Sequence, residues 1–225
     1  MRSGGCDLEL YLIRHAQSTN QVRDEPETKV FDPHLTDLGE RQAVLLAEYL
    51  ADGRERTRAS GGGIHSLVCS PMWRALQTAR PLSEALGLTP EVWLDVHEQV
   101  RATEIRSGST RERIEAAFPD YVLPDGITEQ GWWNRAGESR SETMERAIRV
   151  AEKLRESAES DRRVAIVSHA RFIDSLLKAF LDQLPGYDCW YHHFNTGVSR
   201  LGLGGSRLDV RYLNRVDHLS PALIS

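Results

Sequence analysis

Short, continuous apolar runs recur along the chain, and several of them are followed at once by a helical pattern. Continuous runs of this length are typical of strands that are buried on both faces of a parallel sheet. The predicted strands are Leu8–Ile13, Ile64–Cys69, Val92–Val96 and Arg163–Ser168. Two further segments, Val198–Leu203 and Leu208–Leu213, alternate around Gly204-Gly205 and predict a hairpin of late edge strands.

Residues with helical spacing follow these runs, and capping residues indicate where the helices begin and end. Ser70 has the chemistry of an N-cap and Pro71 that of a first helical position, and Gly87 is expected to end the helix that they begin. Pro81 predicts a kink or break within that helix. The predicted helices are Asp37–Leu50, Pro71–Leu86, a helix that starts at the capping box Ser139-x-x-Glu142 and continues to Leu154, and Phe172–Leu181.

This order of elements predicts the fold. Three units of strand and helix indicate an α/β protein with three layers, in which a mostly parallel central sheet has helices on both faces. We expect one domain over residues 1–225, because no internal repeat or second core is visible. Residues 99–138 lack clear periodicity and predict an inserted cap segment over the active site, whereas the Gly-rich and Arg-rich residues 53–63 predict a linker.

Composition narrows the class of protein. The 225 residues are 40% hydrophobic and 27% charged, which is ordinary for a globular domain. A net charge of -5 argues against general binding to nucleic acid, and no apolar stretch is long enough to cross a membrane. The N-terminus has carboxylates where a signal peptide is apolar, and the three scattered cysteines Cys6, Cys69 and Cys189 fit a reducing compartment. We therefore expect a cytoplasmic protein.

Basic and imidazole side chains follow the predicted strand ends. Arg14 and His15 come after the first strand, Arg74 lies in the first turn after the second, and His169 follows the strand at 163–168. Glu98 comes after the short strand at 92–96. Each residue alone has an ordinary structural explanation, but ligands in such sheets bind beyond the carboxyl ends of the strands. Their joint placement predicts a phosphate site that holds a nucleophile and an acid.

Four segments resemble the motifs of the histidine phosphatase superfamily, the phosphoglycerate-mutase-like proteins. They occur in the order of that family and cover residues from about 8 to 200. The matching segments are Leu12-Ile13-Arg14-His15-Ala16-Gln17-Ser18, Leu35-Thr36-x-x-Gly39-x-x-Gln42-Ala43, Ser70-Pro71-x-x-Arg74-Ala75-x-Gln77-Thr78-Ala79 and Val167-Ser168-His169. Ala16 and Ala170 depart from the family, which usually has glycine at both positions.

The resemblance implies a mechanism and a set of site residues. His15 would attack phosphorus to form a phosphohistidine that water hydrolyses, which divides one difficult displacement into two easier ones. Arg14, Arg74 and His169 would stabilise the transferring group, and Glu98 would be the proton donor, with Glu104 as its rival. Binding of phosphate or substrate is expected from Asn20, Ala170 and Arg171. No metal or other cofactor is implied, because arginines supply the positive charge.

The resulting expectation is a metal-independent phosphatase that hydrolyses a phosphate monoester. The alternatives are a phosphoglycerate-type phosphomutase and a non-catalytic module that binds a phosphorylated ligand. The expected partner is a small phosphorylated substrate, with a phosphorylated protein left open, and no pattern indicates an oligomeric state. His192-His193 is interpreted as a solvent-facing pair, and Trp132-Trp133 either lines a substrate pocket or packs the inserted segment onto the core.

Overall fold

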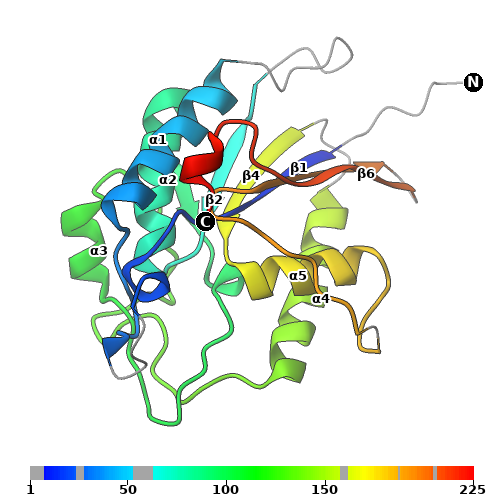
Figure 1. Ribbon diagram of the computed structural model, residues 1–225. Helices are drawn as coiled ribbons and strands as arrows, with labels where there is room; N and C mark the ends of the chain where they lie inside the picture. The colour runs from blue at the N-terminus through cyan, green and yellow to red at the C-terminus, as the bar shows by residue number, and fades with distance from the viewer. Residues whose placement is uncertain (1–7, 24–27, 53–62, 158–161, 187, 205–206) are drawn as a thin grey trace, which may run out of the picture.

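The computed structural model describes residues 8–225, apart from 24–27, 53–62, 158–161, 187 and 205–206 (Figure 1). The strands are β1 (Leu8–Arg14), β2 (Ser66–Cys69), β3 (Pro90–Val92), β4 (Arg162–Ser168), β5 (Val198–Gly204) and β6 (Arg207–Arg215). The α-helices are α1 (Asp37–Ala51), α2 (Trp73–Leu86), α3 (Arg111–Ala117), α4 (Arg140–Glu156) and α5 (Ala170–Phe180). Short 3-10 turns are η1 (Thr19–Gln21), η3 (Leu94–Val96) and η5 (Pro221–Leu223).

The strands form one sheet in the order β3-β2-β4-β1-β5-β6. The first four of these are mutually parallel, and β5 is antiparallel to both of its neighbours, β1 and β6. In the register, Val167 of β4 lies opposite Ile13 of β1 and Cys69 of β2. The carboxyl ends of these three central strands therefore meet at one edge, and the predicted mostly parallel α/β fold is confirmed.

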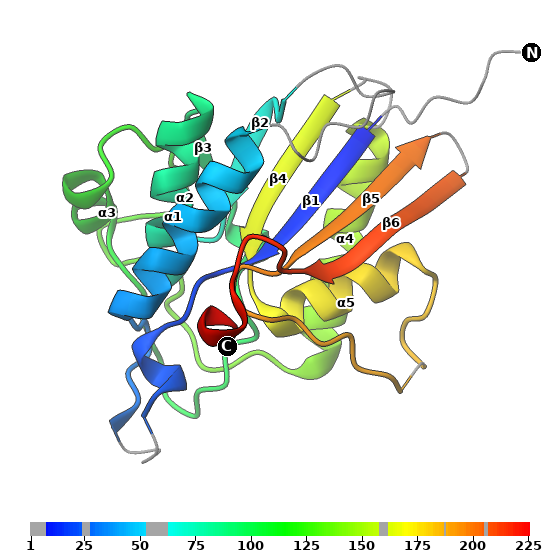
Figure 2. The same ribbon diagram turned by 45° about the horizontal axis from the view of Figure 1, so that its top comes forward.

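Helices cover both faces of the sheet, which gives three layers (Figure 2). In β1, Tyr11 and Ile13 pack into the core beneath α1 and α2, whereas Leu10 and Leu12 pack beneath α4 and α5. Successive side chains of a strand point to opposite faces, so a strand covered on both sides is apolar at most positions. This explains the continuous apolar runs of the sequence.

Among the described residues, no helix is long and apolar enough to span a membrane.

The caps fix most of the helix boundaries that the sequence predicts. Thr36 accepts a hydrogen bond from the backbone N–H of Gly39 at the start of α1, and Ser139 and Glu142 form the predicted capping box at the start of α4. Gly87 ends α2 in the left-handed conformation with φ 64°, which only glycine adopts without a steric cost. Pro81 lies inside α2 without ending it.

Two predicted boundaries are wrong. Ser70 is not the N-cap of α2, because the helix begins at Trp73 with Met72 as its N-cap, and the Ser70 hydroxyl is used elsewhere. The strand predicted over Val92–Val96 ends at Val92. Parallel pairing with β2 stops there, since Val92 lies opposite Cys69, the last residue of β2, and the chain then turns through η3.

The segment at 99–138, which the sequence predicts to be an insertion, packs beside α2. Phe118, which follows α3, meets the ring of Trp73 edge-on with 5.3 Å between ring centroids, and Trp132 is buried in the same core. The segment reaches the carboxyl edge of the sheet through Ser109, whose hydroxyl lies 3.4 Å from Asp32. The linker predicted at 53–63 lies outside the described residues, apart from Gly63.

Candidate active site

Backbone hydrogen bonds join the ends of the three central strands. The N–H of His15 donates to the carbonyl oxygen of Ser168 over 2.8 Å, and the N–H of Ser70 donates to that of Val167 over 3.0 Å. The residues after β1, β2 and β4 therefore share one small region at the carboxyl edge of the sheet, where parallel α/β folds bind their ligands.

His15 is held with one ring nitrogen free of its proton. Its Nδ1 lies 2.7 Å from the carbonyl oxygen of Ala16, an acceptor, so Nδ1 carries the proton of the neutral ring. The other nitrogen, Nε2, accepts a hydrogen bond from Nε of Arg74 over 3.1 Å. Burial, followed by the charges of Arg74 and Arg14, holds the pKa of His15 well below its usual value. His15 is therefore a neutral imidazole with an available lone pair at Nε2.

Arg74 is buried in the first turn of α2 and is oriented by Asp32. The guanidinium lies 3.9 Å from the Asp32 carboxylate, which also accepts the backbone N–H of Trp73 over 2.8 Å. Burial raises the pKa of Asp32, and Arg74 is the largest opposing influence. Asp32 was not expected from the sequence, because it lies in a loop between the recognisable motifs and has no pattern of its own.

The second histidine lies against the first. The ring centroids of His169 and His15 are 5.0 Å apart, with 56° between the ring planes. His169 Nε2 lies 2.7 Å from the hydroxyl oxygen of Ser70, which is the contact that replaces the predicted N-cap role. His169 is fully buried, and this burial, with the Arg74 charge next, holds its pKa well below the usual value.

Arg14 and the backbone of His15 are fixed by the segment before β5. Arg14 donates from Nη1 to the carbonyl oxygen of His193 over 2.5 Å, and the Asn195 side-chain amide donates to the carbonyl oxygen of His15 over 2.9 Å. Burial lowers the pKa of Arg14 to about 10, so its charge persists at neutral pH. The sequence does not predict a site role for Asn195, because its partner His15 lies 180 residues earlier and only the pairing of β5 with β1 brings the two together.

Glu98 lies at the same edge, next to the first turn of α5. One oxygen of its carboxylate accepts the N–H of Gln99 over 2.9 Å, and the other accepts the N–H of Arg171 over 3.3 Å. Burial lowers the pKa values of Arg14 and Arg74, and the negative charge of Glu98 acts in the other direction and raises them. Glu104, the rival acid, is exposed and forms an ion pair with Arg106 at 3.4 Å.

Comparison with known proteins identifies the family of the chain. The profile of the histidine phosphatase superfamily (branch 1) matches residues 10–216. The chain belongs to this superfamily. A glucosyl-3-phosphoglycerate phosphatase of Mycolicibacterium vanbaalenii is 28% identical over 180 residues, which cover 76% of this chain and 73% of that protein. A bifunctional protein of Mycobacterium tuberculosis is 30% identical over 81% of this chain, although the match covers only 46% of its own length.

Solved structures share the fold of this histidine phosphatase. The structure of a mycobacterial glucosyl-3-phosphoglycerate phosphatase in complex with VO3 has a TM-score of 0.63 and 24% identity, and the match covers 92% of this chain and 99% of that one. The solved structure shows the shared fold, whereas the superfamily match and the 28% identical phosphatase support phosphatase activity as the general function of the chain.

The remaining predicted site residues have different surroundings. Asn20 is tied to the loop that precedes α1, because its side-chain amide exchanges hydrogen bonds of 2.7 and 3.0 Å with the backbone of Val30. Ala170 is the first residue of α5, directly after His169. Ala16, which replaces the usual glycine of this superfamily, is fully buried with Leu35 and Ala43, so its methyl group packs in that small cluster.

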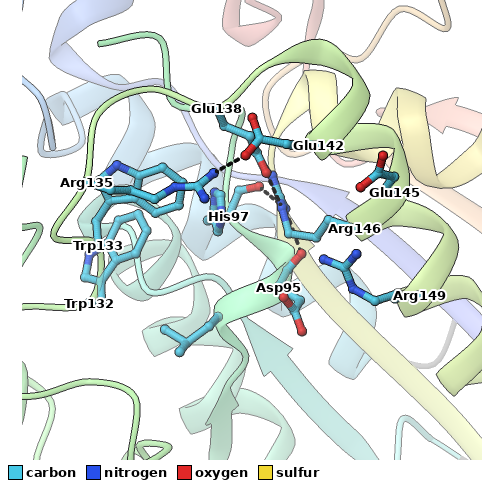
Figure 3. Close-up of a pocket in the computed structure, with 11 residues that line it drawn as sticks. Asp95, His97, Trp132, Trp133, Arg135, Glu138, Glu142, Glu145, Arg146 and Arg149 are labelled. Atoms are coloured by element: carbon cyan, nitrogen blue, oxygen red, sulfur yellow. Dashed lines mark hydrogen bonds and ion pairs between the residues drawn. The ribbon is translucent and has the colours of Figure 1, made fainter. Parts of the chain in front are cut away.

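A separate cavity of about 420 Å³ lies between α4, η3 and the inserted segment (Figure 3). Its most buried charged pair is Arg146 and Glu138, joined by hydrogen bonds of 2.9 and 2.6 Å, and Arg146 also donates to the carbonyl oxygens of Asp95 and His97. His97 packs edge-on against Trp133 with 4.8 Å between centroids. This cavity contains none of the cluster around His15, but its wall includes the residue before Glu98.

Proposed function

We propose that this protein is a metal-independent phosphatase that hydrolyses a phosphate monoester through a phosphohistidine at His15. The observation that carries the proposal is the state of the His15 ring: Nδ1 is engaged by a carbonyl oxygen, and Nε2 is unprotonated and accepts a hydrogen bond from Arg74. An imidazole attacks phosphorus only when it is neutral, and the lowered pKa of His15 keeps it neutral across the physiological range.

In the first step, Nε2 of His15 forms a bond to phosphorus while the bond from phosphorus to the ester oxygen breaks. The released alkoxide takes a proton from Glu98 and leaves as an alcohol. Nε of Arg74 exchanges its hydrogen bond to His15 for one to a phosphoryl oxygen. Arg14 and Arg74 then balance the charge of the three peripheral oxygens, with His169 beside them.

In the second step, water attacks phosphorus as Glu98 accepts one of its protons. The bond from phosphorus to Nε2 breaks, inorganic phosphate forms, and His15 returns to its neutral state. Protons balance over the cycle, because the proton that Glu98 gives to the alcohol is replaced by the one that it takes from water. The two arginines provide the positive charge throughout, so no step requires a metal ion.

Hydrolysis of p-nitrophenyl phosphate tests the proposal. We expect turnover that EDTA does not change and that His15→Ala abolishes while the fold is retained. Failure of the wild-type protein to hydrolyse any of a broad panel of phosphate esters would contradict it. Transfer of the phosphoryl group back to a phosphoglycerate, with stimulation by a bisphosphate, would identify a mutase, and phosphate binding without turnover would identify a binding module.

A further inference from the structure

The segment between α5 and β5 runs past α5 and reaches the carboxyl end of β1 (Figure 2). The N–H of Tyr191 donates to the Asp174 carboxylate of α5 over 2.9 Å, which holds this part of the segment against α5. At its far end, the hydrogen bonds to Arg14 and His15 fix it against the catalytic cluster. Residues 191–195 therefore form a wall of the candidate active site.

Trp190 stands at the outer end of this wall with half of its surface exposed. Its neighbour Tyr191 packs against the core beneath α4 and α5, whereas Trp190 belongs to none of the core clusters of the described residues. The side chain is 52% exposed, and an indole ring that does not pack in the core is free to contact a ligand. The guanidinium of Arg171 lies 5.9 Å from the centroid of this ring, within the range of a cation–π contact.

Arg171 connects Trp190 to Glu98. Its backbone N–H donates to the Glu98 carboxylate, and its exposed side chain extends to the Trp190 ring. Within the described part of the chain, the Arg171 guanidinium has no hydrogen bond or ion pair. An alcohol that receives a proton from Glu98 must leave from beside that carboxylate. The rest of the alcohol would then lie along Arg171 towards Trp190.

We infer that Trp190 and Arg171 select the alcohol part of the substrate, and that they favour an alcohol with an apolar ring and a carboxylate. This inference rests on the proposed function of the same site. The indole face would cover the ring of the alcohol, and the Arg171 guanidinium would pair with its carboxylate as a charge-assisted contact. The substrate class is therefore a phosphate monoester of an acidic, ring-bearing alcohol.

Three substrates separate the two contacts: ethyl phosphate, benzyl phosphate and 4-carboxybenzyl phosphate. All three release a primary alkoxide, so their chemical reactivities are similar and differences in kcat/KM report on recognition. We expect kcat/KM to rise from the first to the third. Trp190→Ala should reduce the benzyl-to-ethyl ratio of kcat/KM by about tenfold, and Trp190→Phe should retain most of it.

Arg171→Gln should reduce the ratio of 4-carboxybenzyl to benzyl phosphate by about fivefold, and salt should reduce the same ratio in the wild-type protein. The matched control is Arg149→Gln, an exposed arginine of α4 that lines the other cavity, and it should leave both ratios unchanged.

Two results would overturn the inference while leaving the proposed phosphatase intact: ratios that do not change in the Trp190 and Arg171 variants, or a uniform loss of activity on all three substrates. A wild-type protein that hydrolyses none of the three, together with none of the broader panel, would instead overturn the proposed function and this inference with it.

Discussion

Nε of Arg74 donates a hydrogen bond to Nε2 of His15 over 3.1 Å, and this contact orders the centre of the site. The arginine occupies Nε2, the nitrogen that attacks phosphorus in the proposed mechanism, so it keeps the proton of His15 on Nδ1. Asp32 lies 3.9 Å from the guanidinium and helps to orient it, so that in the proposed mechanism Arg74 already lies beside the place where negative charge develops. Under that proposal, Arg74 both sets the tautomer of His15 and provides charge for the transferring group.

Loss of the Arg74 guanidinium should strongly reduce the rate of phosphate ester hydrolysis. We expect Arg74→Gln to lower kcat/KM for p-nitrophenyl phosphate by more than tenfold and up to about 10³-fold, the range seen when one preorganised donor is removed. Arg80→Gln is the matched control, because Arg80 lies two turns later on α2 and contacts the Phe118 ring. Equal losses in the two variants would contradict a specific role for Arg74.

The hydrogen bond between Ser70 and His169 should contribute to stability and to activity. Both residues are fully buried, so Ser70→Ala leaves His169 Nε2 without its partner. An unsatisfied buried polar group costs about 1–3 kcal/mol, and we expect that decrease in the free energy of unfolding measured in urea. We also expect a lower kcat, because the His169 ring loses its orientation. A variant with wild-type kcat would exclude Ser70 as a positioning residue.

The Arg146–Glu138 pair should be far more important for stability than a surface pair. Both side chains are almost completely buried, so Glu138→Ala leaves a buried guanidinium without its counterion. Breaking such a pair costs about 3–5 kcal/mol of unfolding free energy. Glu115→Ala removes the exposed partner of Arg111 on α3 and should cost less than about 1 kcal/mol. Chemical denaturation gives the free energy of unfolding of both variants. Similar losses in the two variants would contradict the greater importance of the buried pair.

The stability of the protein should fall in acid, partly because of His193. The structure corrects the interpretation of His192-His193 as a solvent-facing pair, since His193 is only 2% exposed while His192 is exposed. Burial, followed by the charge of Arg14, lowers the pKa of His193 to about 3. Below the ordinary histidine pKa of about 6.5, the unfolded chain binds a proton that the folded protein does not, so stability decreases as pH falls.

This linkage predicts a measurable change in the slope of the unfolding free energy against pH. A histidine that stays neutral only in the folded state contributes about 1.4 kcal/mol per pH unit to the pH dependence of unfolding. His193→Gln should remove that contribution between about pH 5.5 and 4, and His192→Gln should leave the slope unchanged. Urea titrations at several pH values provide the measurement, and parallel slopes for the wild type and His193→Gln would be inconsistent with the prediction.

Local patterns in the sequence predicted most of the fold. The continuous apolar strands, the capping box at Ser139 and the end of α2 at Gly87 depend on neighbouring residues, and the structure confirms them. The N-cap prediction for Ser70 was wrong because a hydroxyl after a strand can bind either a helix N-terminus or a distant side chain. Here the Ser70 hydroxyl contacts His169, which is 99 residues away, and also accepts the backbone N–H of Met72.

The candidate site was predictable only in part, for the same reason. Arg14 ends β1, and His15 and His169 directly follow β1 and β4, so the topology places them together. Asp32 and Asn195 lie in irregular segments, and their contacts depend on how those segments cross the carboxyl edge of the sheet. No periodicity or capping residue in the sequence indicates where such segments lie, so the contacts of Asp32 and Asn195 can be identified only from the structure.

The central claim is tested most directly by trapping the phosphoenzyme. Glu98→Gln should be mixed with p-nitrophenyl phosphate, whose leaving group needs little help from an acid, so that the first step proceeds while hydrolysis slows. Rapid quenching in alkali followed by peptide mass spectrometry should then find phosphate on His15, at a level approaching one per chain, and none in Glu98→Gln combined with His15→Ala. Phosphate on another residue, or hydrolysis by His15→Ala at the wild-type rate, would contradict the account.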